Sequence, residues 1–232
     1  MERESEPWPT FEGRLLPRPE GLRALLDGAP ADRAWLVRAA VVHRDLADSL
    51  GRTLAADLDD PTVEVRAVAL QLARALSLRI LVPLTIDAWE MHPERFIGVP
   101  DPLRPGETLA RTALAFIVDA RLRGEPRVEG FLRAALGVAE LRVEVAYAIG
   151  PEDCGALLPH LETLLSDKPA LAGPLGTWFA LRRPDLCEAA CGAASALPLS
   201  TRRVFGEALL RQLARVHAVG RGVACRRLLA LD

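Results

Sequence analysis

The stretch "DLDDPTVEVRAVALQLARAL", residues 57–76, decides the fold. Asp60 is placed to cap the free amide groups at a helix N-terminus, and Pro61 suits the first helical position, where its missing N–H costs nothing. We therefore predict a helix over residues 61–77. Its apolar side chains form two stripes at helical spacing, one of Val65, Ala69, Leu72 and Leu76 and the other of Val63, Ala67, Leu70 and Ala73. A helix with two apolar faces must pack against two neighbours.

The segment before this helix supplies the first neighbour. It carries a leucine at every fourth position, at Leu46, Leu50, Leu54 and Leu58, which predicts a helix over 44–57 with one apolar face. Strand signals are scarce along the whole chain, since aromatic residues make up only 5%. We predict an all-α fold with helices at 20–27, 32–42, 44–57, 61–77, 80–91, 106–123, 126–136, 138–149, 152–166, 170–182, 185–194 and 200–218, and a short last helix near 222–230.

Residues 50–76 resemble a HEAT repeat. They combine a leucine-bearing first helix, an Asp-Pro turn, and the pair Val65-Arg66 opening a second helix rich in alanine and leucine. The resemblance implies an α-solenoid of stacked antiparallel helical hairpins. It also implies that Asp60, Pro61, Val65 and Arg66 are structural residues, with Arg66 in an ion pair with an acidic turn residue of the neighbouring repeat.

Parts of the motif recur later in the chain. "LRVEVAYAIG", residues 141–150, repeats the entry to the second helix with Arg142, and "LLPHLETLLSDKP", residues 157–169, aligns Asp167 with Asp60. The last copy departs from the family, because no Val-Arg pair follows Asp167 and a proline falls inside the next helix. The resemblance is therefore specific in one repeat and degenerate in the others.

Two proline-rich segments interrupt the helices. Residues 1–20 predict an extended N-terminal arm, and residues 91–107 predict the longest loop, which is either a functional insertion or a seam between two halves. The remainder, residues 21–232, is expected to form one repeat domain. Trp8 in the arm and Trp89 beside the loop are candidate anchors, either to this protein's own surface or to a partner.

The overall charge bears on the class of partner. A net charge of −2 and a pI near 6.1 lack the basic excess typical of nucleic-acid or anionic-membrane binding. The N-terminus carries charges where a secretion signal needs an apolar segment, and no stretch is apolar enough to span a bilayer. We expect a cytoplasmic protein whose partner is neither nucleic acid nor membrane.

No constellation of residues indicates catalysis. Cys187 and Cys191 would share one helix face and could bind zinc with Cys154 and His160, but no second paired ligand motif is present. These cysteines and Cys225 are interpreted as buried thiols. The four histidines are scattered and no glycine-rich phosphate loop occurs, so we expect no catalytic residue, no metal and no cofactor.

The C-terminal end is basic. Residues 200–232 hold seven arginines against two acidic residues, and Arg211 and Arg215 lie one helical turn apart. With Arg202 and Arg203 they could bind an acidic or phosphate-bearing partner, or they could form a solvated end of the stack.

These features favour a protein-protein interaction scaffold or adaptor that binds a partner on a solenoid surface. The alternative is an enzyme on the same architecture, a HEAT-like DNA glycosylase, which needs a basic groove with aromatic and acidic residues inside it. Residues 1–60 hold eight arginines against twelve acidic residues, which counts against that alternative. No motif supports a third possibility, a HEAT-like chromophore lyase.

Overall fold

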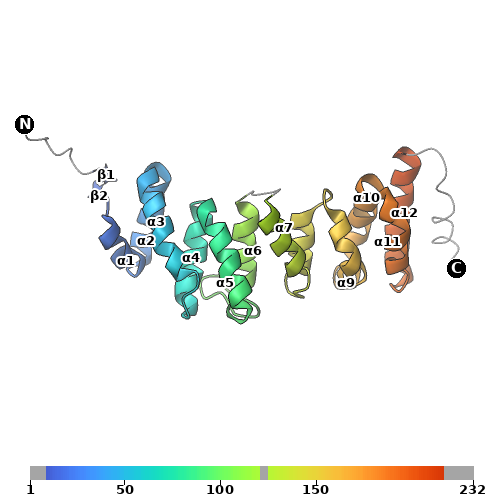
Figure 1. Cartoon of the computed structure of the whole chain (residues 1–232), viewed down its shortest axis with the longest axis horizontal. Coiled ribbons are helices and arrows are strands. Elements are labelled where there is room, and N and C mark those ends of the chain that lie inside the picture. The colour runs from blue at the N-terminus through green and yellow to red at the C-terminus, as the bar shows by residue number, and fades with distance from the viewer. Residues whose placement is uncertain (1–8, 121–124, 217–232) are drawn as a thin grey trace, which may run out of the picture. The chain divides into compact units, whose positions relative to one another are not determined.

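The structure is a computed structural model that describes residues 9–120 and 125–216, and the statements below concern those residues. Their fold is all-α, with twelve α-helices, short 3-10 segments and one two-stranded hairpin (Figure 1). The chain divides into two compact units, residues 1–128 and 129–232. No helix in the described part of the chain has the length and apolarity needed to cross a membrane.

The first unit runs from the hairpin to the start of α7. Its elements are β1 (Thr10–Phe11), β2 (Arg14–Leu15), α1 (Pro19–Leu26), α2 (Pro30–Val42), α3 (Arg44–Asp57), α4 (Val63–Ala75), η1 (Arg79–Leu81), α5 (Val82–Met91), η2 (Pro93–Arg95), α6 (Leu109–Asp119) and α7 (Pro126–Ala135). Helices α1, α2 and α3 each pack against the next helix along the chain. Contacts also skip one helix, since α1 touches α3 and α4 touches α6.

The opening stretch packs as its two apolar faces predict. Leu50, Leu54 and Leu58 are fully buried at the α3 side, and α4 buries Ala67, Ala69, Leu70, Leu72 and Ala73. Because α4 contacts both α3 and α6, its broad apolar surface is covered on two sides. Val65 is only half-buried, so one predicted stripe reaches the edge of the interface.

The N-terminal segment contains a feature that the sequence did not indicate. Instead of a purely extended arm, β1 and β2 form an antiparallel hairpin joined by Glu12 and Gly13, both at positive φ, as two-residue hairpin turns require. The hairpin docks on α2: the Trp35 Nε1–H donates to the Phe11 carbonyl over 3.3 Å, and Arg38 pairs with Glu12. Residues 10–15 therefore lie on the protein itself. Trp8 lies outside the described residues.

The second unit contains the remaining helices. Its elements are η3 (Cys154–His160), η4 (Pro169–Leu171), η5 (Pro184–Leu186), α8 (Arg142–Ile149), α9 (Leu161–Asp167), α10 (Ala172–Arg182), α11 (Cys187–Ala194) and α12 (Leu199–Val216). The predicted helix over 152–166 is wrong in its first half, where the chain forms η3 with Pro159 inside it. Proline cannot donate the backbone hydrogen bond that an α-helix would need there.

Helices α10 and α12 form the tightest pair in this unit. At Gly176 the two backbones approach so closely that a Cβ would lie 2.4 Å from the Phe205 carbonyl oxygen. Helix α9 contacts α11 in the same unit, so contacts that skip one helix occur here as well.

Candidate functional site

The turn before α4 differs from its predicted form. Helix α4 begins at Val63 with Thr62 as its N-cap, so Asp60 does not cap the helix and Pro61 is not its first residue. Asp60 instead accepts a hydrogen bond from the Thr62 backbone N–H over 2.7 Å, which holds the pKa of its carboxyl below the ordinary value. The carboxylate is satisfied within the turn itself, and this delays the helix start by two residues.

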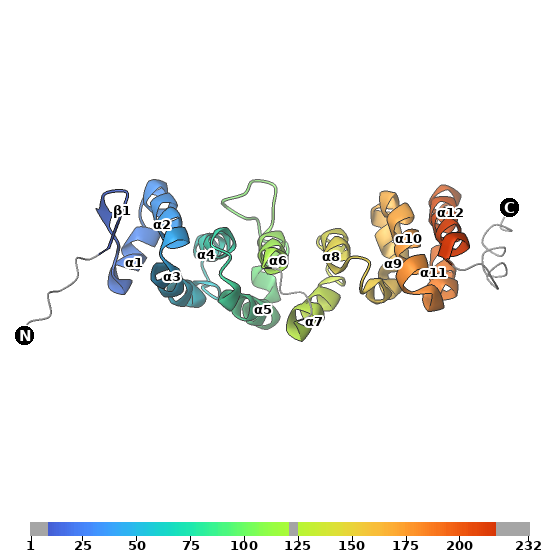
Figure 2. The ribbon, with the colours of Figure 1, turned by 90° about the horizontal axis from the view of Figure 1, so that it is seen from above.

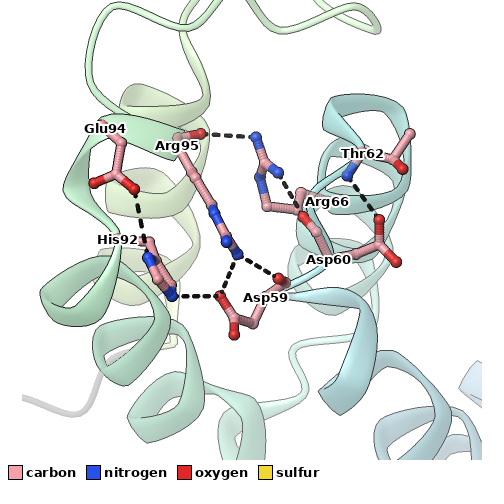
Figure 3. Close-up of polar contacts among 7 residues, drawn as sticks. All are labelled: Asp59, Asp60, Thr62, Arg66, His92, Glu94 and Arg95. Atoms are coloured by element: carbon pink, nitrogen blue, oxygen red, sulfur yellow. Dashed lines mark hydrogen bonds and ion pairs between the residues drawn. The ribbon is translucent and has the colours of Figure 1, made fainter.

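Arg66 is buried and binds backbone carbonyls. Its guanidinium donates to the Asp60 carbonyl and, over 3.0 Å, to the Arg95 carbonyl, which is 29 residues away in sequence (Figure 3). Only 3% of the residue is exposed, and burial followed by the charge of Arg95 lowers the pKa of its guanidinium. The expected ion pair between Arg66 and an acidic turn residue is therefore wrong, because the nearest acceptors are main-chain oxygens.

The ion pair at this corner belongs to Arg95. Its Nη1 donates to the Asp59 carboxylate over 2.9 Å and to the Asp59 carbonyl over 2.8 Å. His92 lies beside them, 3.9 Å from the Asp59 carboxylate and 3.4 Å from Glu94 (Figure 3). Together with Arg66, these contacts fasten the turn before α4 to the corner after α5.

Arginines at three other helix starts make similar contacts. Arg33 donates to the Gly28 and Leu26 carbonyls over 2.9 and 3.1 Å, and Arg202 donates to the Ser195 carbonyl over 3.2 Å. Like Arg66, both are the fourth residue of their helix. Each guanidinium thus satisfies carbonyls left free where the preceding helix ends.

Arg142 supplies the fourth example and includes the expected ion pair. It is the first residue of α8, and its Nε–H donates to the Leu136 carbonyl over 3.1 Å. Its Nη1 also pairs with the Asp167 carboxylate over 2.8 Å. Asp167 is the residue that the sequence aligns with Asp60. The arginine-to-acid contact implied by the resemblance is therefore present at Arg142 and absent at Arg66.

Sequence reasoning missed Arg33 and Arg202 as members of this set. The available signal was an arginine close to a helix start, but without Val-Arg beside it the residue looks like any surface arginine. Only the position of the preceding helix end shows what the guanidinium binds.

Trp89 is not a surface anchor. It is 7% exposed, and its ring centroid lies 5.3 Å from that of Phe96, which is fully buried. The aromatic pair joins α5 to the start of the long loop. Its predicted role in binding a partner is therefore corrected to one in the core.

Of the four arginines predicted for the basic end, three share an exposed line along α12 and one does not. Arg202 is half-buried and turned toward Ser195, and its Nε is buried without a hydrogen-bond acceptor. Arg203, Arg211 and Arg215 are exposed along α12 at a spacing of four or eight residues, with Glu207 in the same line and 3.5 Å from Arg203. The exposed stripe thus contains three arginines and one carboxylate.

The cysteines within the described residues, Cys154, Cys187 and Cys191, are buried as the sequence predicts. Burial raises the pKa of the Cys154 thiol to about 11, so this sulfur stays protonated at neutral pH and is a poor metal ligand or nucleophile. In the described ranges, no three histidine, cysteine or acidic side chains are grouped so as to hold a metal ion. Cys225 lies beyond residue 216 and outside the description.

The contacts at the α4 corner join the turn before α4 to the segment after α5. The charged groups at this corner are paired with one another or with carbonyls. Comparisons with protein-family models, with curated proteins and with solved structures found no match to this chain.

Proposed function

We propose that this chain is a HEAT-like α-solenoid of stacked helical hairpins and that it binds a partner protein as a scaffold or adaptor. The packing within each unit supports the stacked arrangement. Contacts that skip one helix, α1 with α3 and α4 with α6 in the first unit and α9 with α11 and α10 with α12 in the second, are those expected when hairpins stack.

The recurring arginine contact supports the repeat. The arginines lie within the first four residues of α2, α4, α8 and α12, which are all even-numbered helices and would be second helices of hairpins in the stack. Arg33 and Arg66 are 33 positions apart, close to the 34 residues or more of most helical-hairpin repeats. A contact that depends on how one helix ends and the next begins is a property of the repeated unit.

The observation that carries the binding role is a line of exposed apolar side chains that runs from η1 along one face of α5. Ile80, Leu84 and Met91 recur at helical spacing and are 73%, 41% and 61% exposed. Asp87 interrupts the line, and its carboxylate forms an ion pair with Arg127. The opposite face of α5 is buried, so these three side chains are not needed for packing within the unit. Apolar side chains aligned in this way are typical of a surface that a partner covers.

The proposal is tested by isolating a partner with the full chain. The chain is immobilised, exposed to an extract of its native cells, and any retained protein is purified and titrated against it. We expect a defined complex whose affinity falls at least tenfold when Leu84 and Met91 are both replaced by serine. The control is Leu199→Ser, which removes a leucine that is 59% exposed from another helix. An extract that yields no specific partner would refute the binding role.

A further inference from the structure

The connection between η2 and α6 is far longer than the fold needs. It spans residues 96–108, whereas helix-helix connections in bundles are usually about 2 to 8 residues long. The segment lies wholly inside the first unit, so it is an insertion rather than the seam between the two units. Figure 2 shows it extending away from the helices next to α6. Long ordered loops of this kind usually have a function of their own.

Backbone hydrogen bonds close the base of this loop. The Leu109 N–H donates to the Val99 carbonyl over 2.9 Å, and the Ala110 N–H donates to the Phe96 carbonyl over 3.1 Å. One step further out, Pro100 and Thr108 form an isolated antiparallel bridge. The two ends of the loop are thereby held together and joined to the first turn of α6.

The buried carboxylate of Asp101 fixes the outer part of the loop. Asp101 is only 3% exposed, and its two oxygens accept hydrogen bonds from the Thr112 hydroxyl over 2.6 Å and from the Leu103 N–H over 2.8 Å. Its own N–H donates to the Glu107 carbonyl over 2.9 Å. Burying a carboxylate is costly unless it is fully paired, so this arrangement allows the loop few other conformations.

The hydrogen bonds of Asp101 act as an anchor for the loop tip, which is exposed and partly apolar. It consists of Pro102, Leu103, Arg104 and Pro105, all solvent-exposed, with Leu103 at 44%. Among the described residues, the Arg104 guanidinium has no hydrogen-bond or ion-pair partner. By contrast, the guanidinium groups of the nearby Arg66 and Arg95 both donate hydrogen bonds within the protein.

We propose that the tip, residues 102–105, is a preformed docking element for a partner protein whose surface offers an apolar pocket bordered by carboxylates. Leu103 fills the pocket and Arg104 pairs with its acidic edge. Leucine supplies the buried area, arginine is enriched among residues that dominate interfaces, and the flanking prolines and the Asp101 anchor reduce the entropy lost on binding. One cation beside an apolar side chain suits a protein pocket rather than a phosphate backbone, which is bound by several cations along its length.

This inference rests on the proposed protein-binding function, and the experiment separates the two. The double variant Leu103→Ser with Arg104→Glu is compared in the full chain with Leu181→Ser with Arg182→Glu. The control removes the same Leu-Arg pair from α10, where the leucine is also 44% exposed. All four side chains are exposed, and the ion pair of Arg182 with Glu152 in the control is exposed as well. An exposed ion pair contributes only about 0–1 kcal/mol, so both variants should keep the helix content of the wild type and a melting temperature close to it.

The probe is the protein captured by the wild-type chain, purified and titrated against each variant. We expect the tip variant to lose at least tenfold in affinity and the control to lose less than twofold. The wild-type affinity should also fall with salt more steeply than that of the tip variant, because an ion pair is lost from the variant. If the two variants bind equally well, the docking role of the tip is refuted while the binding function stands. If the wild type captures no protein, both proposals fail.

A second pair of variants tests the anchor as a positioning element. Thr112→Val removes the hydroxyl that holds Asp101, whereas Thr112→Ser keeps it. We expect Thr112→Val to lower affinity for the same probe at least threefold at a temperature where both variants remain folded, and Thr112→Ser to restore it. Equal binding by the two variants would show that the loop need not be held in place.

Discussion

At the scale of single residues, buried arginine is the most informative feature. Arg66 has lost nearly all contact with water, yet its hydrogen-bond partners are carbonyls rather than carboxylates. Main-chain oxygens at helix ends are already partly negative and lack donors of their own, so they can stabilise a cation without burying a second full charge. The carboxylate of Asp59 instead forms an ion pair with Arg95, whose side chain is more exposed than that of Arg66.

Replacing Arg66 with alanine should destabilise the protein. Two carbonyls would lose a charged donor, and hydrogen bonds to charged groups contribute about 1.5–3 kcal/mol each at most, so we expect a loss of about 2 kcal/mol in unfolding free energy. Urea denaturation followed by circular dichroism measures it. The control is Arg74→Ala, whose ion pair with Asp119 is solvent-exposed and should contribute about 0–1 kcal/mol. Equal effects of the two variants would contradict the assigned role of Arg66.

Cys154 offers a test that depends on pH. Burial raises the pKa of its thiol to about 11, so we expect almost no alkylation by iodoacetamide at pH 8 in the folded protein and rapid alkylation after unfolding. The folded chain holds this proton more tightly than the unfolded chain. The contribution of the thiol to stability is therefore complete below its ordinary pKa of 9.0 and declines as the pH rises from there toward 11. Peptide mass spectrometry would report the modification, and fast labelling of folded Cys154 at pH 8 would refute the expectation.

At the scale of elements, the spacing between helices depends on small residues. Helix α11 is rich in alanine, but the close backbone approach lies at Gly176 in α10. There a Cβ would also meet the Leu209 backbone nitrogen at 3.2 Å. Gly192 of α11, in contrast, faces open space, with nothing within 4 Å of a Cβ. Small residues alone do not reveal which of them a neighbour uses.

Replacing Gly176 and Gly192 with alanine should have opposite effects on stability. Gly176→Ala forces α10 and α12 apart against backbone atoms and should destabilise the protein by about 1–3 kcal/mol. Gly192→Ala adds no clash and should stabilise α11 by roughly 0.5–1 kcal/mol, because alanine favours the helix. Thermal unfolding of both variants measures the difference. A Gly176→Ala variant as stable as the wild type would show that the close approach is not required.

At the scale of the whole molecule, the distribution of charge separates the two functional readings. A scaffold tolerates arginines and acids mixed along an exposed helix, as Arg203, Glu207, Arg211 and Arg215 are along α12. A DNA glycosylase would need its cations to converge on the duplex. The net charge of this chain is −2, so binding to DNA would release few counterions unless its cations were gathered on one surface.

We accordingly predict weak binding to duplex DNA. Fluorescence anisotropy with a short labelled duplex should give a dissociation constant no tighter than about 1 µM at physiological salt, in the range of non-specific binding. A low-nanomolar constant with a steep salt dependence would favour the glycosylase alternative over the scaffold.

The sequence alone determined the all-α fold and the α3–α4 hairpin, because apolar spacing and a proline turn act within one or two helical turns. It also placed three cysteines in the core and the proline-rich loop close to its observed bounds.

Tertiary structure decided the rest. The acceptors of Arg66, the burial of Trp89 against Phe96 and the docking of the N-terminal hairpin all involve segments that meet only after the helices have packed. Asp60 was assigned to the wrong amide for a related reason: a carboxylate in a turn takes the nearest free N–H, and backbone geometry determines which one that is. Local pattern therefore predicts where helices form, whereas contacts between distant segments determine what their polar side chains do.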